Sequence, residues 1–297
     1  MISQPLKGIG TALVTPFRED GSLDVDAVRR LAQRQIENGV DMLIPCGTTG
    51  EAVTLDPAEY EQVVATVVEA SAGRVPVIAG AGSNSTAATI ASAKRAEACG
   101  ADAVLIVGPY YNKPTQEGYY QHFRAVAEAV DCAVVMYNVP GRTGGNITAA
   151  TQLRIAEIDN VVATKEASGD LGQIARIVRG RPEGFSVLSG DDNLVLAQIA
   201  LGIDGVISVA ANEVPDLFSR MVHLAMEGRF AEARDLHYQL LDLLDGNFLE
   251  SNPIPVKTAM GMMGLLTERF RLPLVPMQDA NRQTLRNILV ALDLIRD

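Results

Sequence analysis

Histidine, a frequent catalytic base and metal ligand, is scarce in this sequence. Three occur among 297 residues, His122, His223 and His237, and all fall in stretches with helical periodicity, away from the ends of the predicted strands. Because α/β barrels hold their chemistry at strand ends, a Ser-His-Asp triad and a histidine-ligated metal are excluded. Proton transfer must then rest on tyrosine, threonine, a carboxylate or lysine, and we expect no metal ion.

Cysteine, positive charge and long apolar runs are also in short supply. Cys46, Cys99 and Cys132 are odd in number and lie in apolar segments, which suits reduced thiols in a cytoplasmic core. The net charge of −11 disfavours nucleic acid and anionic membranes as partners. No apolar run approaches the ~20 residues of a membrane span, and residues 1–7 lack a basic-then-apolar signal region. We therefore expect a cytoplasmic globular protein.

Lysine occurs only five times, and one copy has an unusual position. Lys165 lies within residues 161–168, VVATKEAS, a run of β-branched and small residues typical of a buried strand. Burial lowers the pKa of a lysine because it disfavours the charged form, and a neutral amine can attack a ketone to form a Schiff base. The alternative is a strand-end lysine that reaches solvent or pairs with Glu166.

A helix–turn–strand pattern repeats along the chain. Residues 37–44, 98–105 and 200–207 each combine a helix tail, a glycine suited to a left-handed turn, an aspartate and an apolar strand. Together with other apolar runs, the pattern predicts eight strands, near residues 8–15, 41–46, 75–80, 102–107, 133–138, 161–166, 185–190 and 205–210. Amphipathic helical stretches separate the strands, for example residues 24–38, 57–70, 85–99 and 115–129.

Eight strands alternating with helices over ~220 residues predict an α/β protein with a (β/α)₈ TIM barrel. A doubly wound sheet would fit the same alternation, but no Gly-x-Gly-x-x-Gly follows the first strand. From about Phe230 the strands stop, and helices are predicted for residues 230–245, 255–266 and 279–296. We expect a catalytic barrel over residues 1–229 and a C-terminal helical domain over residues 230–297.

Polar residues cluster where the predicted strands end. GTTGE (47–51) follows the second strand, GPYYNKP (108–114) the fourth, YNVPGRTG (137–144) ends the fifth, and SGDD (189–192) ends the seventh. Each segment also has a purely structural interpretation: helix-capping threonines, tyrosines that plug the barrel, a solvated Arg142, and a turn with a helix N-cap. Their placement at successive strand ends favours one site around Lys165.

These residues together resemble a known family. Lys165 in KEASGD, Tyr137 in YNVPGRT and the GTTGE segment are similar to the dihydrodipicolinate synthases (4-hydroxy-tetrahydrodipicolinate synthases), within the class I pyruvate aldolase family that includes N-acetylneuraminate lyase. The likeness covers essentially the whole chain. Sialic acid lyases share the lysine and the tyrosine but usually carry serine for Thr48 and lack Arg142, so the synthase branch fits better.

The resemblance implies a mechanism. Lys165 would form an imine with pyruvate, Tyr137 would act as acid and base, and hydroxyls of Thr48 and Tyr111 would relay its proton. In the family the phenol that matches Tyr111 comes from a neighbouring subunit, and a homotetramer built from dimers is usual. No cofactor is needed.

The same resemblance implies the substrate contacts. Thr49 and the backbone at Ile207 would hold the pyruvate carboxylate, Gly190 would allow close backbone approach, and Arg142 would grip the carboxylate of L-aspartate 4-semialdehyde. The enamine formed on Lys165 would add to this aldehyde. Ring closure would then release 4-hydroxy-tetrahydrodipicolinate, for lysine and diaminopimelate biosynthesis.

Three other functions fit these residues less well. A lyase for sialic acid or a 2-keto-3-deoxy sugar acid is the nearest alternative, and Thr48 and Arg142 weigh against it. A catalytically silent barrel that binds a keto acid would be expected to have lost Lys165 or a relay hydroxyl. A pyridoxal phosphate enzyme would need a stronger phosphate cradle than residues 80–83, GAGS.

Regulation is expected to depart from part of the family. Lysine-inhibited members use a histidine and a glutamate to bind the amino acid at a subunit interface, whereas Tyr60 and Ala88 stand at these positions here. Asn84 and Tyr110 of that pocket remain. An ammonium taken out of water without a carboxylate is poorly compensated, so we expect weak or absent inhibition by L-lysine unless Glu59 substitutes.

Overall fold

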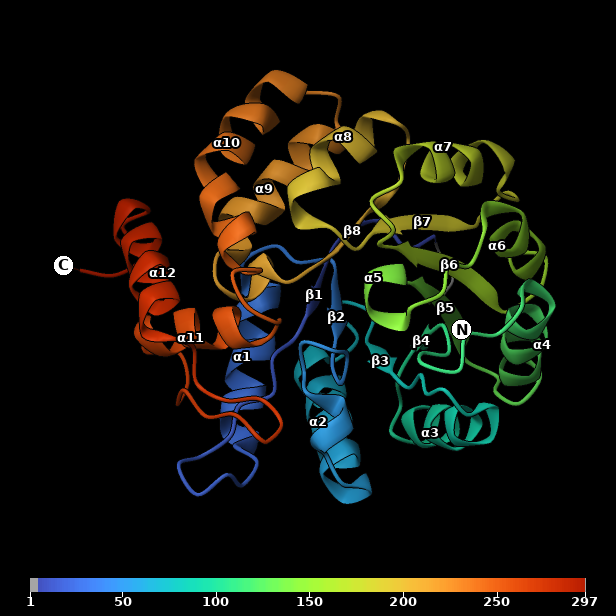
Figure 1. Ribbon diagram of the computed structural model, residues 1–297, viewed down its shortest axis with the longest axis horizontal. Helices are drawn as coiled ribbons and strands as arrows, with labels where there is room; N and C mark the ends of the chain where they lie inside the picture. Colours follow the sequence, from blue (N-terminus) through green and yellow to red (C-terminus); the bar gives the residue numbers. More distant parts are fainter. Residues whose placement is uncertain (1–4, 297) are drawn as a thin grey trace.

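Eight parallel strands form the centre of the protein in the computed structural model, which describes residues 5–296 (Figure 1). The strands are β1 (Gly8–Ala12), β2 (Met42–Ile44), β3 (Ile78–Gly80), β4 (Ala103–Val107), β5 (Ala133–Asn138), β6 (Val161–Glu166), β7 (Ser186–Ser189) and β8 (Gly205–Ser208). They pair in the order β2-β1-β8-β7-β6-β5-β4-β3, and a parallel bridge between Leu43 and Val77 joins β2 to β3. The predicted (β/α)₈ barrel is confirmed, and each strand lies within its predicted range.

Twelve α-helices are described within residues 5–296. They are α1 (Val25–Glu37), α2 (Pro57–Ser71), α3 (Thr86–Ala98), α4 (Gln116–Ala127), α5 (Pro140–Thr143), α6 (Ala149–Ile155), α7 (Leu171–Gly180), α8 (Val195–Ala200), α9 (Pro215–Met226), α10 (Phe230–Gly246), α11 (Ile254–Met262) and α12 (Asp279–Ala291). Three short 3₁₀ turns accompany them, η1 (Ala52–Thr54), η2 (Asp192–Leu194) and η3 (Ala210–Asn212).

The ends of the barrel helices follow from their capping residues. The four helices predicted between residues 24 and 129 match α1 to α4 within two residues at each end. Each begins after a side chain that accepts a hydrogen bond from a backbone N–H of the first turn: Asp24, Asp56, Ser85 and Thr115. Two later predictions were too long. The helix α11 stops before Gly264, which has a positive φ of 71°, and α12 stops before Asp293, which has a φ of 56°.

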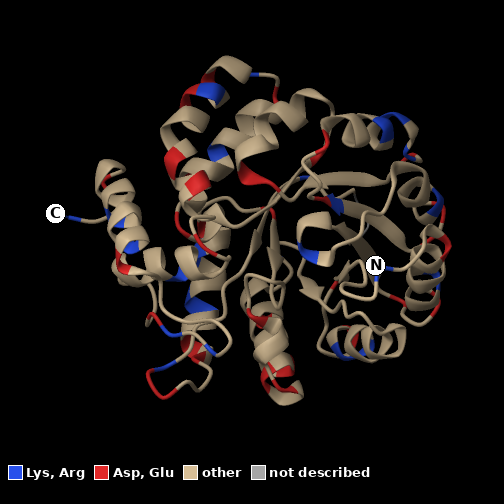
Figure 2. Cartoon of the chain, in the orientation of Figure 1, with Lys and Arg blue, Asp and Glu red and all other residues tan. Residues whose placement is uncertain are grey.

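Charge is almost absent from the strands (Figure 2). Among the eight strands described, only β6 carries charged residues, Lys165 and Glu166. Successive side chains of a strand point to opposite faces, so these two neighbours face different surroundings. Ala163 packs in the apolar barrel interior, and Thr164 donates outward to Gln152 at 2.9 Å. By the same alternation, Lys165 faces the barrel interior and Glu166 faces the helices.

The C-terminal helices pack directly on the barrel. Helix α10 lies against α8 and α9, while α12 lies against α10 and α11 (Figure 1). Because α10 packs closely on α9, the domain boundary after residue 229 stays a prediction. Within residues 5–296, no helix has the length and apolar character needed to cross a bilayer. Most of residues 1–7, for which no signal region is predicted, lies outside the described residues.

Candidate active site

Lys165 lies inside the barrel near the carboxyl end of β6. It is 6% exposed, and its Nζ lies 4.4 Å from the centre of the ring of Tyr137, its neighbour in register on β5. A β-carbon at Gly190 would stand 3.0 Å from Lys165 Cε and 2.6 Å from Ala167 Cβ, so only glycine fits beside the lysine. Within the described chain, Lys165 Nζ makes no hydrogen bond or ion pair, which leaves the amine free to react.

Glu166 is not the partner of Lys165. Its carboxylate points away from the interior and accepts hydrogen bonds from Gln152 Nε2 at 2.5 Å, Ser168 N at 2.9 Å and Asn138 Nδ2 at 3.0 and 3.1 Å. This set of donors satisfies a buried carboxylate that has no cation beside it. The alternative interpretation of Lys165, as a lysine that reaches solvent or pairs with Glu166, is therefore wrong.

Burial changes the pKa of both Lys165 and Tyr137. It lowers the pKa of Lys165 to about 8, although Asp192 and Asp191 oppose the shift and Arg142 adds to it. At neutral pH roughly a tenth of such amines are uncharged, compared with fewer than one in a thousand for an ordinary lysine. Burial also raises the pKa of Tyr137 to about 12, so its phenol keeps its proton. The site therefore pairs a reactive amine with a nearby proton donor.

Most of the predicted site residues line one small cavity. This cavity of about 80 Å³ holds Lys165 and is lined by residues in or just after several strands, including Thr48, Thr49, Tyr137, Arg142 and Gly190. Ile207 is not among the lining residues. Its side chain is 1% exposed and packs in the apolar barrel interior below them, so only its backbone could serve a ligand, as the resemblance implies.

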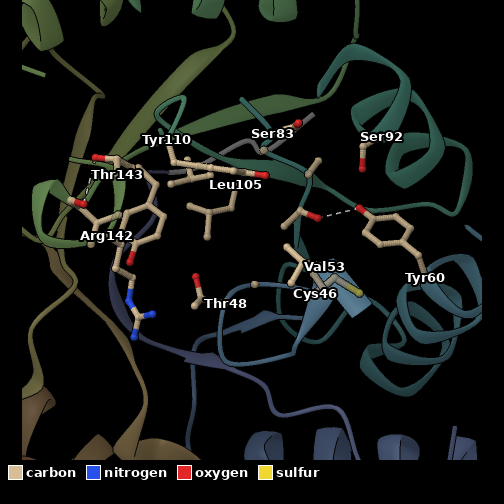
Figure 3. Close-up of a pocket in the computed structure, with 18 residues that line it drawn as sticks. Cys46, Thr48, Val53, Tyr60, Ser83, Ser92, Leu105, Tyr110, Arg142 and Thr143 are labelled. Atoms are coloured by element: carbon tan, nitrogen blue, oxygen red, sulfur yellow. Dashed lines mark hydrogen bonds between the residues drawn. The ribbon is translucent and has the colours of Figure 1, made fainter. Parts of the chain in front are cut away.

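A larger cleft of about 540 Å³ opens from the small cavity, and the two share Thr48, Tyr137 and Arg142. Figure 3 shows Thr48 and Arg142 facing this hollow, with Tyr110 and Tyr60 on its other sides. Arg142 is exposed but lines both spaces, and within the described chain no carboxylate pairs with it. A cation at the mouth of the site is placed to meet an incoming anion.

Tyr111 does not reach the site of its own chain. It is 88% exposed, lines neither cavity and has a positive φ of 73°, which is uncommon for a residue other than glycine. Its backbone N–H donates to Thr143 O at 3.2 Å, which ties this conformation to the α5 turn. The tyrosine therefore projects outward from the chain and does not plug the barrel.

One structural interpretation of the loop segments is wrong and another holds only in part. The threonines of GTTGE do not cap the next helix, since the N-cap of η1 is Glu51 without a side-chain bond and that of α2 is Asp56. The SGDD segment does form a turn, in which Asp191 N donates to Ser189 Oγ at 3.0 Å, and Asp191 is the N-cap of η2 but makes no side-chain capping bond. Asp192 accepts instead from Val209 N at 2.9 Å and Ala210 N at 2.8 Å, and residues of both segments line the cavity.

Sequence reasoning gave no site role to two residues that line the small cavity, Asp191 and Asn252. Burial raises the pKa of Asp191 to about 6, although Lys165 opposes the shift, and its Oδ2 is buried without a hydrogen-bond partner. Asn252 Nδ2 donates to Thr49 Oγ1 at 3.0 Å. The signal for Asp191 was present in the acidic pair after β7. Asn252 lies 203 residues from Thr49, so no local pattern could join them.

Comparison with known proteins gives consistent matches. The model of the dihydrodipicolinate synthetase family matches residues 5–292. The chain is 54% identical over 284 residues to the 4-hydroxy-tetrahydrodipicolinate synthase of Koribacter versatilis, with 95% of each chain covered. The dihydrodipicolinate synthase structure from Aquifex aeolicus has a TM-score of 0.95 at 44% identity, covering 98% of this chain and 100% of that one. DHDPS from Cyanidioschyzon merolae, solved with lysine bound, has a TM-score of 0.94 at 42% identity, covering 97% of this chain and 99% of that one.

Proposed function

The chain belongs to the dihydrodipicolinate synthetase family and condenses pyruvate with L-aspartate 4-semialdehyde to 4-hydroxy-tetrahydrodipicolinate, and we propose that it does so through an imine on Lys165. The observation that carries the proposal is the amine of Lys165, which is buried, lines the cavity and has no ion-pair partner among residues 5–296. The reaction is a step of lysine and diaminopimelate biosynthesis. The enzyme is a lyase of the class I aldolase type.

The chemistry begins with the neutral amine. Lys165 Nζ attacks the carbonyl carbon of pyruvate, and the carbonyl oxygen leaves as water to give a protonated imine. This cation draws electrons from the methyl group, which loses a proton and becomes the carbon nucleophile of an enamine. That carbon adds to the aldehyde of L-aspartate 4-semialdehyde. The amino group of the adduct then attacks the imine carbon, closes the ring and releases Lys165.

Tyr137 is proposed as the group that gives and takes protons beside Lys165. With a pKa of about 12 its phenol is protonated at neutral pH, so it can accept a proton only if it passes its own proton on. Thr48, which lines the same cavity, is the first hydroxyl of this relay, and Tyr111 of a second copy is the next. The outward position of Tyr111 supports its donation across an interface.

The cavity walls suit two anionic substrates. Thr49 and the backbone at Ile207 are proposed to hold the pyruvate carboxylate, with Gly190 leaving space beside the lysine. Arg142, at the mouth, is proposed to bind the carboxylate of L-aspartate 4-semialdehyde.

We further propose a homotetramer built from dimers, because the site is incomplete in one chain. A cytoplasmic setting is supported by the three free cysteines.

The decisive experiment is to trap the imine. The enzyme is incubated with pyruvate, reduced with borohydride and analysed by peptide mass spectrometry, and the adduct is expected on Lys165. Lys257 is an internal control, because it is also buried but donates to Glu51 Oε1 at 2.5 Å. A stoichiometric adduct on Lys257, or none on any lysine, would overturn the proposal.

Arg142→Ala is expected to damage the use of the second substrate selectively. Loss of a charged hydrogen-bonding partner should raise the KM for L-aspartate 4-semialdehyde by roughly 10- to 100-fold, while trapping of pyruvate on Lys165 is nearly unchanged. Steady-state kinetics and borohydride trapping measure the two effects. Arg179→Ala, at an exposed arginine of α7, is the matched control. A variant that loses trapping yet condenses the aldehyde normally would contradict this role.

Feedback inhibition by L-lysine is proposed to be weak or absent. Tyr60 is buried and donates to Gly80 O at 2.9 Å, while Ala88 brings no charge. Glu59 is a poor substitute, since Arg271 already binds both its oxygens at 2.5 and 2.6 Å. Assays with increasing L-lysine measure the effect, and the enzyme of Cyanidioschyzon merolae, whose structure holds lysine, is a positive control for binding. Clear inhibition at submillimolar L-lysine would refute the proposal.

A further inference from the structure

Three hydrogen bonds join the C-terminal helical part to the turn that follows β2. Asn252 Nδ2 donates to Thr49 Oγ1 at 3.0 Å, and Lys257 Nζ donates to Glu51 Oε1 at 2.5 Å. The backbone N–H of Arg271 donates to Glu51 Oε2 at 3.3 Å. Thr49 lines the cavity around Lys165, so these bonds connect residues more than 200 positions away to the substrate pocket.

Glu51 depends on these partners for its conformation. Its φ of 51° lies in the left-handed region, which is unfavourable for a residue with a side chain. Its side chain is completely buried, as is that of Lys257. Lys257 also donates to Arg269 O at 2.6 Å and lies 4.5 Å from the ring centre of Phe17. A buried pair of this kind persists only when both charges are satisfied, so α11 holds the turn in this shape.

Asn252 controls which way the Thr49 hydroxyl can donate. A hydroxyl has one proton and two lone pairs. Because the amide N–H of Asn252 occupies a lone pair of Thr49 Oγ1, the hydroxyl proton is not used by this contact and remains available to the cavity. Both residues are buried, and both line the cavity that holds Lys165. A carboxylate only accepts hydrogen bonds, so a hydroxyl held in this way suits the carboxylate of pyruvate.

We propose that Asn252, supported by the Lys257–Glu51 pair, is a positioning residue that makes the Thr49 hydroxyl a donor to the pyruvate carboxylate. The inference rests on the proposed function, because it takes pyruvate bound at Lys165 as its premise. It makes the C-terminal helical part a component of the pyruvate site.

Asn252→Asp tests the direction of the hydrogen bond. Aspartate has no N–H, so the Thr49 proton would turn to the new carboxylate and away from the substrate. The KM for pyruvate is expected to rise by roughly 10- to 100-fold, as for a lost hydrogen bond to a charged group, while trapping on Lys165 at saturating pyruvate persists. Asn287→Asp, an exposed change on α12, is the control. An unchanged KM in Asn252→Asp would overturn the inference, whereas loss of trapping in the unmodified enzyme would overturn the proposed function instead.

A double-mutant cycle separates donor direction from charge repulsion. Thr49→Val removes the hydroxyl and keeps the volume, so Asn252→Asp should raise the KM for pyruvate little further in that background. If Asn252→Asp raises the KM equally with and without the Thr49 hydroxyl, the residue acts through its charge and the inference fails. A lower melting temperature with normal KM in Asn252→Asp would show a structural role only, and would also overturn it.

The supporting ion pair is tested by changing both partners. Lys257→Met alone leaves a buried carboxylate unpaired and is expected to destabilise the fold, whereas Lys94→Met, at an exposed lysine, is not. Lys257→Met combined with Glu51→Gln removes both charges and should fold better than the single variant. Its KM for pyruvate is nevertheless expected to stay several-fold above that of the unmodified enzyme. A folded double variant with normal KM would overturn the supporting role of the pair.

Discussion

Lys165→Ala is expected to abolish turnover, by on the order of 10⁴-fold or more, while the fold persists. In the proposed mechanism the amine is the covalent partner of pyruvate, and in the described chain no other lysine lines the cavity. Stability should change little or improve, because Lys165 is 6% exposed, no described residue forms an ion pair with it, and its ammonium form is costly to bury. A coupled assay measures turnover, and thermal melting with near-ultraviolet circular dichroism measures the fold.

Two further variants make this result specific. Lys165→Met keeps the length of the side chain and should be equally inactive, which excludes loss of volume as the cause. Lys113→Ala changes an exposed lysine and should leave trapping and turnover intact. Substantial turnover by folded Lys165→Ala, at more than a few per cent of the unmodified rate, would end the imine proposal.

Tyr111→Phe is expected to lower kcat by roughly 10²- to 10⁴-fold while pyruvate can still be trapped on Lys165. The change deletes one hydroxyl of the proposed relay and leaves the amine untouched. Tyr111 is 88% exposed and lies outside the cavity of its own chain, so the proposal places its hydroxyl in the site of a neighbouring copy. Steady-state kinetics and borohydride trapping of the same variant separate proton relay from imine formation.

Mixed oligomers test whether Tyr111 acts across an interface. A dimer of one Tyr111→Phe chain and one Lys165→Ala chain contains one complete site, in which the intact Lys165 meets the intact Tyr111 of its partner. Random mixing should therefore restore about a quarter of the unmodified activity. Tyr137→Phe mixed with Lys165→Ala is the control and should restore nothing, because Tyr137 and Lys165 are register neighbours within one barrel. Equal failure of both mixtures, in demonstrated hetero-oligomers, would contradict donation by the partner.

Local patterns in the sequence were sufficient for the barrel and for the position of its central lysine. Strand alternation and helix caps act over a few residues, so the eight strands and the starts of the first four helices follow from short segments. The same locality limits what can be inferred. Whether Lys165 pairs with Glu166 depends on side-chain direction and on Gln152 and Asn138, which belong to neighbouring elements.

The contacts of the turn after β2 show the same limit over longer distances along the chain. Asn252 and Lys257 meet Thr49 and Glu51 across more than 200 residues, and neither motif by itself indicates the contact. Hydrogen bonds and buried ion pairs at such separations depend on how the C-terminal helices pack on the barrel.

The amino-acid sequence by itself determined the fold class and the family and predicted which amine reacts, because each is encoded in contiguous segments with a local physical meaning. Only the tertiary structure decided that Lys165 Nζ has no hydrogen-bond or ion-pair partner among the described residues, that Tyr111 projects outward from its own chain, and that residues after 230 contact the turn after β2. Burial, pKa and hydrogen-bond direction are properties of surroundings assembled from distant parts of the chain, and these surroundings exist only once the barrel and its C-terminal helices have packed together.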